Sequence, residues 1–163
     1  MPARAGGERG FAPMSAADGT RVADYRFWVG ERVRFNDLDL LGHVNNIAYV
    51  VYVETGRASF LRSLGMFELD ARRQTVIARF EMDYRRELGY PADVRVGVRV
   101  LAIGRSSFRI GVGIFDGDGC VASALNVIVR WDRERHQAVA LDAAERAALT
   151  AWLGDGPEPV LTV

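Results

Sequence analysis

Residues 45–65 carry the sequence NNIAYVVYVETGRASFLRSLG, and this stretch decides the fold. Residues 47–53 have the β-branched and aromatic composition of a strand. The apolar character continues to Leu64, however, and such a length exceeds that of an ordinary strand. With Asn45 or Asn46 as N-cap and Gly65 as C-cap, the length favours a helix, while the composition leaves a strand open. A helix that is apolar nearly all round in its first two turns is expected to be buried.

The segments around this stretch alternate between apolar and polar residues, which is typical of strands. Alternation covers residues 25–35, 74–87, 94–100, 107–115 and 120–131. The last two segments flank Asp116-Gly117-Asp118-Gly119, a strong hairpin turn signal. Asp142 then caps an Ala-rich helix that runs to about residue 153. A strand, a loop, a long buried helix, four strands and a short helix predict an α+β fold with the helix against a curved sheet.

The domain organisation follows from length and composition. A chain of 163 residues, 49% hydrophobic and 26% charged, is suited to one globular domain. Residues 1–22 are rich in Gly, Ala and Pro without periodicity, which predicts a disordered leader. We therefore expect a single domain over residues 23–153 and a flexible tail over residues 154–163.

Charge and cysteine content exclude several classes of function. A formal net charge of +0 gives no broad electrostatic basis for binding nucleic acid or an anionic membrane. No apolar run approaches the roughly 20 residues that span a bilayer. Cys120 is the only cysteine, so no intramolecular disulfide can form, and a cytoplasmic location is expected. All 21 cationic residues are Arg, so any phosphate would be bound by guanidinium groups.

The polar residues are concentrated immediately before the long helix. Within ten residues lie Asp37, Asp39, His43, Asn45 and Asn46, and Glu54 follows two turns into the helix. Peptide N–H groups of a first helical turn lack internal partners and suit the stabilisation of an oxyanion. A nearby carboxylate can act as general base or nucleophile, so this loop can form a minimal acyl-transfer site.

Each of these residues also has an ordinary structural explanation. Asp and Asn before a helix commonly cap it or form turns, and a loop histidine can simply bond to backbone. The sequence has no Gly-x-Ser-x-Gly elbow, no phosphate-binding Gly-rich loop and no cysteine pair. A single His with loosely spaced carboxylates fixes no metal geometry, so no cofactor and no metal are expected.

Taken together, the motif is far more specific than its parts. It runs Arg34-Phe35-x-Asp37-x-Asp39-x-x-Gly42-His43-Val44-Asn45-Asn46-x-x-Tyr49-x-x-Tyr52-x-Glu54-x-x-Arg57. This motif resembles the signature of hotdog-fold thioesterases, in the subgroup similar to 4-hydroxybenzoyl-CoA thioesterase. The resemblance extends over about residues 25–135 and includes weaker blocks at Tyr84-Arg85-Arg86 and at residues 104–108. It implies that the ambiguous stretch is a central helix wrapped by the sheet.

The resemblance also implies roles for individual residues. Asp39 matches the carboxylate that acts as base or nucleophile, and the backbone N–H of Asn46 matches the group that polarises the thioester carbonyl. Further implied roles concern His43 and Glu54 in catalysis, Asp37 in holding the loop, and Asn45, Tyr49, Arg105 and Ser106 in substrate binding. The implied substrate is an acyl-CoA, or an acyl-carrier thioester, bound by a homodimer or a dimer of dimers.

Two alternatives remain open. The chain could be a non-catalytic acyl-CoA-binding module, in which the same fold only holds the ligand. It could also be a hotdog dehydratase or hydratase, although the His43-Val44-Asn45-Asn46 context argues against this. The length and chemical character of the acyl group cannot be predicted from the sequence.

Overall fold

The computed structural model describes residues 19–69 and 71–153 of the chain. Most of the expected leader and the whole expected tail lie outside this part. The last residues assigned to the leader, 19–22, are described and lie against the domain. The Tyr25 hydroxyl donates a hydrogen bond of 2.6 Å to the Gly19 carbonyl, and a short 3-10 turn, Val22–Asp24, follows.

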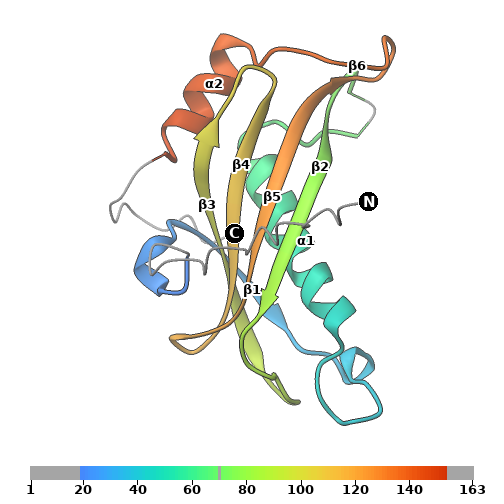
Figure 1. Ribbon diagram of the computed structural model, residues 1–163, viewed down its shortest axis with the longest axis vertical. Coiled ribbons are helices and arrows are strands. Elements are labelled where there is room, and N and C mark those ends of the chain that lie inside the picture. The colour runs from blue at the N-terminus through green and yellow to red at the C-terminus, as the bar shows by residue number, and fades with distance from the viewer. Residues whose placement is uncertain (1–18, 70, 154–163) are drawn as a thin grey trace, which may run out of the picture.

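The described residues form a single antiparallel sheet and two α-helices (Figure 1). The sheet order is β1-β3-β4-β5-β2, with β6 paired to the end of β5. The strands are β1 (Phe27–Arg32), β2 (Arg73–Tyr84), β3 (Asp93–Ile103), β4 (Ser107–Asp116), β5 (Gly119–Asp132) and β6 (Gln137–Ala138). The helices are α1 (Asn46–Ser63) and α2 (Ala143–Thr150), and a 3-10 turn occupies Phe35–Asp37. The expected order of elements is confirmed, and β6 is an addition to it.

The ambiguous stretch is a helix, as its length indicated. Asn45 is the N-cap, and its side chain accepts a hydrogen bond of 2.9 Å from the Ile47 N–H. Gly65 follows the helix with a φ of 66°, a conformation that glycine adopts without strain. Gly56 lets α1 approach β3 closely, because a Cβ at this position would lie 2.5 Å from Val96 Cγ1.

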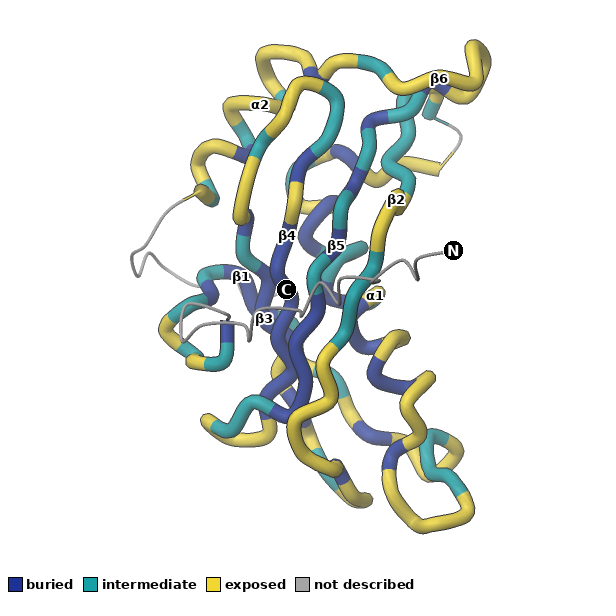
Figure 2. Tube along the Cα trace, in the orientation of Figure 1, coloured by how far each residue is buried: buried dark blue, intermediate teal, exposed yellow. Residues whose placement is uncertain are grey.

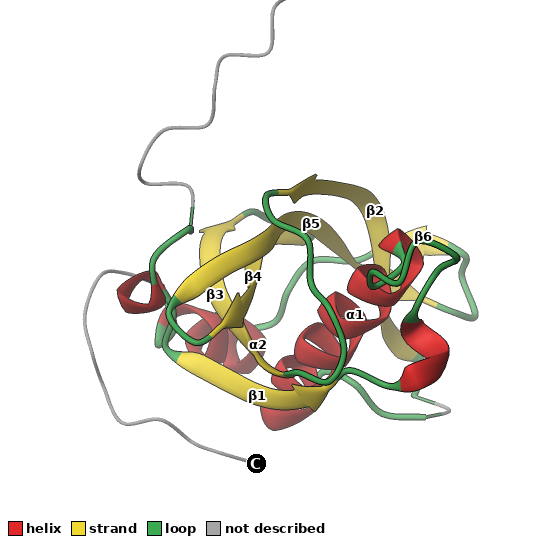
Figure 3. Ribbon diagram, turned by 90° about the horizontal axis from the view of Figure 1, so that it is seen from below, coloured by secondary structure: helices red, strands yellow, loops and turns green. Residues whose placement is uncertain are grey.

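The sheet curls around α1, with β1 and β2 at its two edges (Figure 3). The helix packs mainly against β1, β3 and β4, and the core fills the space between them. Fully buried members of this core include Phe27, Tyr52, Phe60, Val98, Phe108 and Ile110. A curved antiparallel sheet wrapped around one long helix is the hotdog fold.

One side of α1 is open to solvent, contrary to the expectation that its first turns are buried all round (Figure 2). Ile47 is 71% exposed and Val51 is 44% exposed. The reason is geometric, since the sheet contacts one side of the helix and, among residues 19–69 and 71–153, nothing covers Ile47 and Val51 on the other side. This expectation is therefore wrong for the isolated chain.

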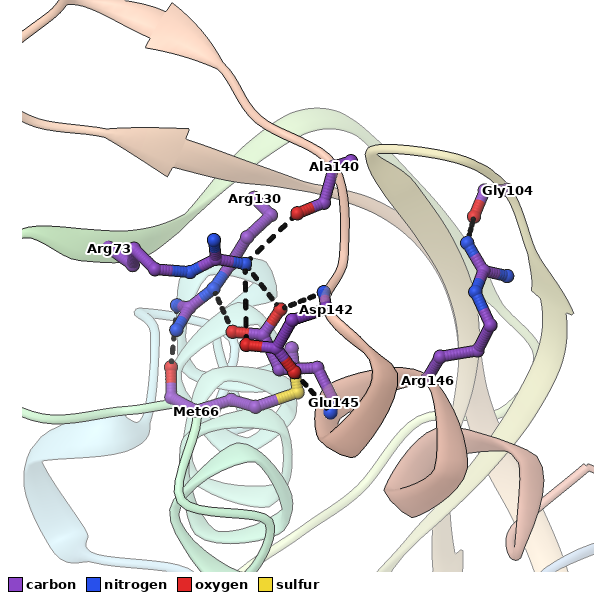
Figure 4. Close-up of polar contacts among 8 residues, drawn as sticks. All are labelled: Met66, Arg73, Gly104, Arg130, Ala140, Asp142, Glu145 and Arg146. Carbon is purple, nitrogen blue, oxygen red and sulfur yellow. Dashed lines mark hydrogen bonds and ion pairs between the residues drawn. The ribbon is translucent and has the colours of Figure 1, made fainter.

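The second helix, α2, is attached to the sheet by a buried ionic cluster (Figure 4). The Glu145 carboxylate accepts hydrogen bonds from Arg73 Nη2 at 2.6 Å and from Arg130 Nε at 2.8 Å. Its Oε2 also accepts the Asp142 N–H, which completes a capping box at the start of α2. Both Arg130 and Glu145 are almost fully buried and paired, so the cluster joins α2 to the ends of β2 and β5.

Within the two described ranges, no helix combines the length and the apolar character needed to cross a membrane.

Candidate active site

The polar loop before α1, residues 37–45, is a compact turn held by its own backbone hydrogen bonds. Leu38 and Val44 form an isolated antiparallel bridge. Between them, the Asp39 N–H donates to the His43 carbonyl at 2.8 Å, and the Gly42 N–H donates to the Asp39 carbonyl at 3.1 Å. Gly42 has a φ of 80°, which the turn requires and which other residues rarely adopt. The loop is thus positioned independently of any ligand.

The two carboxylate oxygens of Asp39 differ in their surroundings, because one is bonded to the loop and the other is not. Its Oδ1 accepts the N–H groups of Leu41 at 2.8 Å and His43 at 3.3 Å. Among the bonds of the described residues, none engages Oδ2, and the side chain is half-buried. One oxygen therefore fixes the carboxylate, while the other is free to act on a water or on a carbonyl.

Asp37 has a structural position instead. Its Oδ2 accepts the Tyr52 hydroxyl at 2.5 Å and the Arg34 N–H at 2.7 Å, and its carbonyl accepts the Asn45 N–H at 2.8 Å. Burial, followed by the bond to Asp37, raises the pKa of Tyr52 well above its ordinary value. Asp37 thus connects the loop to the core-facing side of α1, as the resemblance implied.

The amino end of α1 presents an unpaired peptide donor. Asn45 accepts the Ile47 N–H through its side chain and the Ala48 N–H through its carbonyl. In the described part of the chain the Asn46 N–H, at the first helical position, has no acceptor. The Tyr84 hydroxyl donates to the Asn46 carbonyl at 3.1 Å and holds this end of the helix beside β2. Such a free N–H at the positive end of a helix dipole is suited to an oxyanion.

Asp39 and Asn46 line the same pocket, of about 300 Å³. Its other lining residues are His43, Val44, Tyr49, Tyr84, Arg85, Arg86 and Glu87. His43 Nε2 lies 3.4 Å from Glu87 Oε2 at the rim. A second, larger pocket of about 980 Å³ on the other side of the loop is lined by Asp39 and Asn45 together with Phe35, Leu38 and residues 40–42. The structure therefore brings together Asp39, His43, Asn45, Asn46 and Tyr49.

The sequence assigned no individual role to Tyr84 and Arg86, which the structure places in this pocket. The ring of Tyr84 meets Tyr49 edge-on at 5.4 Å, and the Tyr49 hydroxyl donates to the Arg86 carbonyl at 3.4 Å. The signal was the Tyr84-Arg85-Arg86 block, but its position at the end of a strand gave no indication of contact with the helix start.

The remaining candidates lie elsewhere within one chain. Glu54 is 65% exposed, lies two turns further along α1, and is paired with Arg57 at 3.3 Å. Arg105 and Ser106 occupy the turn between β3 and β4, at the end of the sheet near α2 and opposite to the polar loop (Figure 1). Their carbonyls accept the N–H groups of Leu141 and Arg130. A single chain does not bring these three residues to Asp39.

Among the residues that the structure describes, no three His, Cys, Asp or Glu side chains are grouped so that they could hold a metal ion.

Comparison with known proteins identifies the family. The model of the thioesterase-like superfamily matches residues 33–153. The chain belongs to the thioesterase-like superfamily. It is 30% identical over 128 residues to the uncharacterized protein YsmA of Bacillus subtilis (strain 168), covering 77% of this chain and 86% of that protein.

Solved structures of this superfamily are similar in fold. A thioesterase of Thermus thermophilus, solved with coenzyme A and Zn, is 33% identical with a TM-score of 0.65 and covers 75% of this chain and 95% of its own. A predicted thioesterase of Bacillus stearothermophilus is 26% identical with a TM-score of 0.74 and covers 80% of this chain and 98% of its own. The hotdog thioesterase resemblance of the sequence is confirmed at the level of family and fold.

Proposed function

We propose that this superfamily member hydrolyses an acyl-CoA thioester to a free acid and a thiol. The observation that supports this most directly is the pocket that Asp39 and Asn46 both line, since among the described residues Asp39 Oδ2 and the Asn46 N–H have no hydrogen-bond partner. A carboxylate beside an unpaired helix N-terminus supplies the two groups that acyl transfer needs, and the site requires no further cofactor.

In this mechanism the thioester carbonyl oxygen accepts the Asn46 N–H, which polarises the carbon. In one route Asp39 takes a proton from a water that attacks this carbon. In the other, Asp39 attacks the carbon directly and forms an anhydride, which a water then hydrolyses. In both routes the oxyanion collapses and the carbon–sulfur bond breaks. The departing thiolate takes up the proton that Asp39 removed from the water in the first route, and a proton from solvent in the second. His43 and Asn45 keep the loop and the N-cap in place for this step.

Coenzyme A is the proposed thiol carrier. The Thermus thermophilus relative was solved with coenzyme A, and here Arg85 and Arg86 line the pocket next to Asp39. Guanidinium groups bind phosphate through paired donors, so these two residues are suited to the nucleotide end of the carrier.

A second copy of the chain is the proposed partner. The open side of α1 exposes Ile47 and Val51, and in the described part of the chain β2 is an edge strand that pairs on one side only, with β5. A two-fold pairing of β2 with its copy would cover both features. Because the pairing is antiparallel, it would also move Glu54, Arg105 and Ser106 of one chain towards the loop of the other, in a dimer or a dimer of dimers.

The test is the release of free thiol from a panel of acyl-CoAs by the wild type and by Asp39→Asn. The amide cannot act as base or nucleophile, so we expect kcat to fall by about 10²–10⁴-fold while the fold is retained. Asp93→Asn is the matched control, because this carboxylate is 73% exposed and pairs with Arg32 at the surface. Its activity should equal that of the wild type.

Two outcomes would contradict the proposal in different ways. Tight binding of acyl-CoA by the wild type without any thiol release would leave a non-catalytic binding module. Undiminished thiol release by Asp39→Asn would retain hydrolysis and reject the assignment of Asp39.

A further inference from the structure

Asn126 is a buried polar residue in the middle of the sheet, and one of its donors is unsatisfied. It lies on the face of β5 that is turned towards α1, paired with Ile110 on β4 and Phe80 on β2, and is 0% exposed. Its Oδ1 accepts Arg57 Nη1 at 3.2 Å, but within the described residues its buried Nδ2 has no hydrogen-bond partner. A buried donor without a partner destabilises the folded state, and an apolar residue of similar size would avoid this penalty.

Arg57 adds a second polar side chain that is mostly buried, next to Asn126. Its side chain is only 14% exposed, and burial lowers the pKa of its guanidinium. One Nη bonds to Asn126 and the other lies 3.3 Å from Glu54, which is itself mostly in solvent. A guanidinium has five N–H donors, and these two contacts leave others available. Together with the unpartnered Asn126 Nδ2, they form a group with more N–H donors than acceptor oxygens, which we name the donor cluster.

This donor cluster lies in line with the proposed oxyanion site. Asn46, Val50 and Arg57 are spaced i, i+4 and i+11, so they follow one stripe of α1. Along the helix axis the stripe measures about 16 Å from Asn46 to Arg57. The stripe lies beside β2 and β5, because the Asn46 carbonyl accepts the Tyr84 hydroxyl of β2 at one end and Arg57 donates to Asn126 of β5 at the other.

The residues between these two polar ends are apolar. They are Val50 on the α1 stripe together with Phe80 and Met82 on β2, and we name these three residues the α1–β2 strip. Val50 is 36% exposed, and Phe80 and Met82 are half-buried against the core. Residues 80 to 84 of β2 extend over about 13 Å, somewhat less than the about 16 Å of the stripe on the helix. An alkyl chain that starts at Asn46 would reach the donor cluster after crossing the strip.

We propose that Arg57 and Asn126 form a subsite that selects acyl groups with an acceptor oxygen, from a hydroxyl or a carboxylate, at the distal end of the chain. This rests on the proposed function for the position of the thioester. The distal oxygen accepts the unpartnered Asn126 N–H and a free Arg57 N–H, so that binding such a substrate removes the cost that the unliganded protein carries. An unsubstituted alkyl end leaves the buried Asn126 Nδ2 without an acceptor among the described residues and is disfavoured.

The experiment compares straight-chain acyl-CoAs with their ω-hydroxy and ω-carboxy counterparts of equal length. We expect the wild type to prefer an ω-oxygenated substrate in kcat/KM by about tenfold or more at one chain length, since a hydrogen bond to a charged group contributes about this factor. The double variant Arg57→Met/Asn126→Leu should lose or invert this preference. Arg62→Met on the exposed side of the same helix is the matched control and should keep it.

Two further measurements keep the two proposals separate. The double variant should remain folded, because apolar residues of similar volume commonly replace buried polar groups without loss of stability. Asn126→Leu alone removes the unpartnered amide and keeps the Arg57–Glu54 pair, so it serves if the double variant does not fold. Calorimetric titration of Asp39→Asn with the same thioesters gives the preference as a ratio of Kd values without turnover.

Equal kcat/KM and equal Kd for alkyl and ω-oxygenated chains of every length would overturn the subsite while leaving hydrolysis intact. A preference in Kd that Asn126→Leu abolishes, with no cleavage of any thioester, would support the subsite and reject the proposed function. A preference that survives in both Asn126→Leu and the double variant would place the selecting group elsewhere and overturn the assignment.

Discussion

Asp37 and Asp39 are separated by a single residue, yet their surroundings give them different chemistry. The Asp37 carboxylate accepts a tyrosine hydroxyl at 2.5 Å and a backbone N–H at 2.7 Å on the same oxygen, and so connects the loop to α1. The Asp39 carboxylate is held only by its own turn and faces a pocket. Neither spacing nor residue type distinguishes the two, because the difference depends on Tyr52, fifteen positions further along the chain.

Asp132 gives a prediction on acid stability. Its nearly buried carboxylate accepts the Arg135 N–H at 2.9 Å, the Glu134 N–H at 3.0 Å and Arg72 Nε at 3.1 Å. The backbone bond from Arg135, with the contribution of Arg72, lowers the pKa of Asp132. A lowered pKa stabilises the folded state above the unfolded value of about 3.9, and this stability is lost as pH falls through the lower folded value.

We therefore expect Asp132→Asn to unfold at a lower urea concentration than the wild type near neutral pH. The difference should begin to shrink as the pH is taken below about 4, where the carboxylate of the unfolded chain takes up a proton, and should vanish once the folded carboxylate is also protonated at its lower pKa. Asp118→Asn is the control, because this carboxylate is 94% exposed. A difference that stays constant across this pH range would show that the charge of Asp132 does not stabilise the fold.

At the scale of elements, the contact between α1 and β3 depends on Gly56. Replacing Gly by Ala inside a helix ordinarily gains about 1 kcal/mol in propensity. Here the added Cβ would lie 2.5 Å from Val96 Cγ1, on a β-branched side chain with little rotamer freedom, and such overpacking costs about 1–3 kcal/mol. We expect Gly56→Ala to lower the free energy of unfolding, as measured in urea.

A double-mutant cycle separates the two effects. In a Val96→Ala background the clash is absent, so Gly56→Ala should then stabilise the helix instead of destabilising the fold. If Gly56→Ala raises the stability of the otherwise wild-type protein, propensity outweighs packing and the close approach is not limiting.

The sequence predicted elements better than contacts. The length of residues 47–64 and the Asp-Gly turn at residues 116–119 indicated α1 and the β4–β5 hairpin, because these signals are local. The same holds for the loop, where Asp39, Asn45 and Asn46 lie close together in sequence. The Tyr84 contact with Asn46 and the Arg57 contact with Asn126 join positions 38 and 69 residues apart. Strand pairing and the placement of the helix decide such contacts, and no local pattern encodes them.

At the scale of the molecule, one side of the fold exposes an edge strand and apolar residues of α1. Sheet edge β2 has 12 residues and pairs only with β5 within the described chain. Beside it, the first two turns of α1 expose Ile47, Val50 and Val51. Long edge strands and contiguous apolar surface are usually covered in stable proteins. The separation of Glu54, Arg105 and Ser106 from the loop has the same explanation if a second chain supplies them.

The last prediction tests this dimer. Val51 lies on the open side of α1 and lines neither pocket of the polar loop, so Val51→Arg should leave each chain folded and place an unpaired charge in the interface. Such a charge costs several kcal/mol, and we expect the mass measured by sedimentation to fall from that of a dimer to that of a monomer. Leu69→Arg is the control, since Leu69 is 89% exposed beyond the end of α1. If thiol release falls with the mass, the site is shared between chains. A wild type that sediments as a fully active monomer would instead show that Asp39 and Asn46 of one chain suffice, and that Glu54, Arg105 and Ser106 have no part in the reaction.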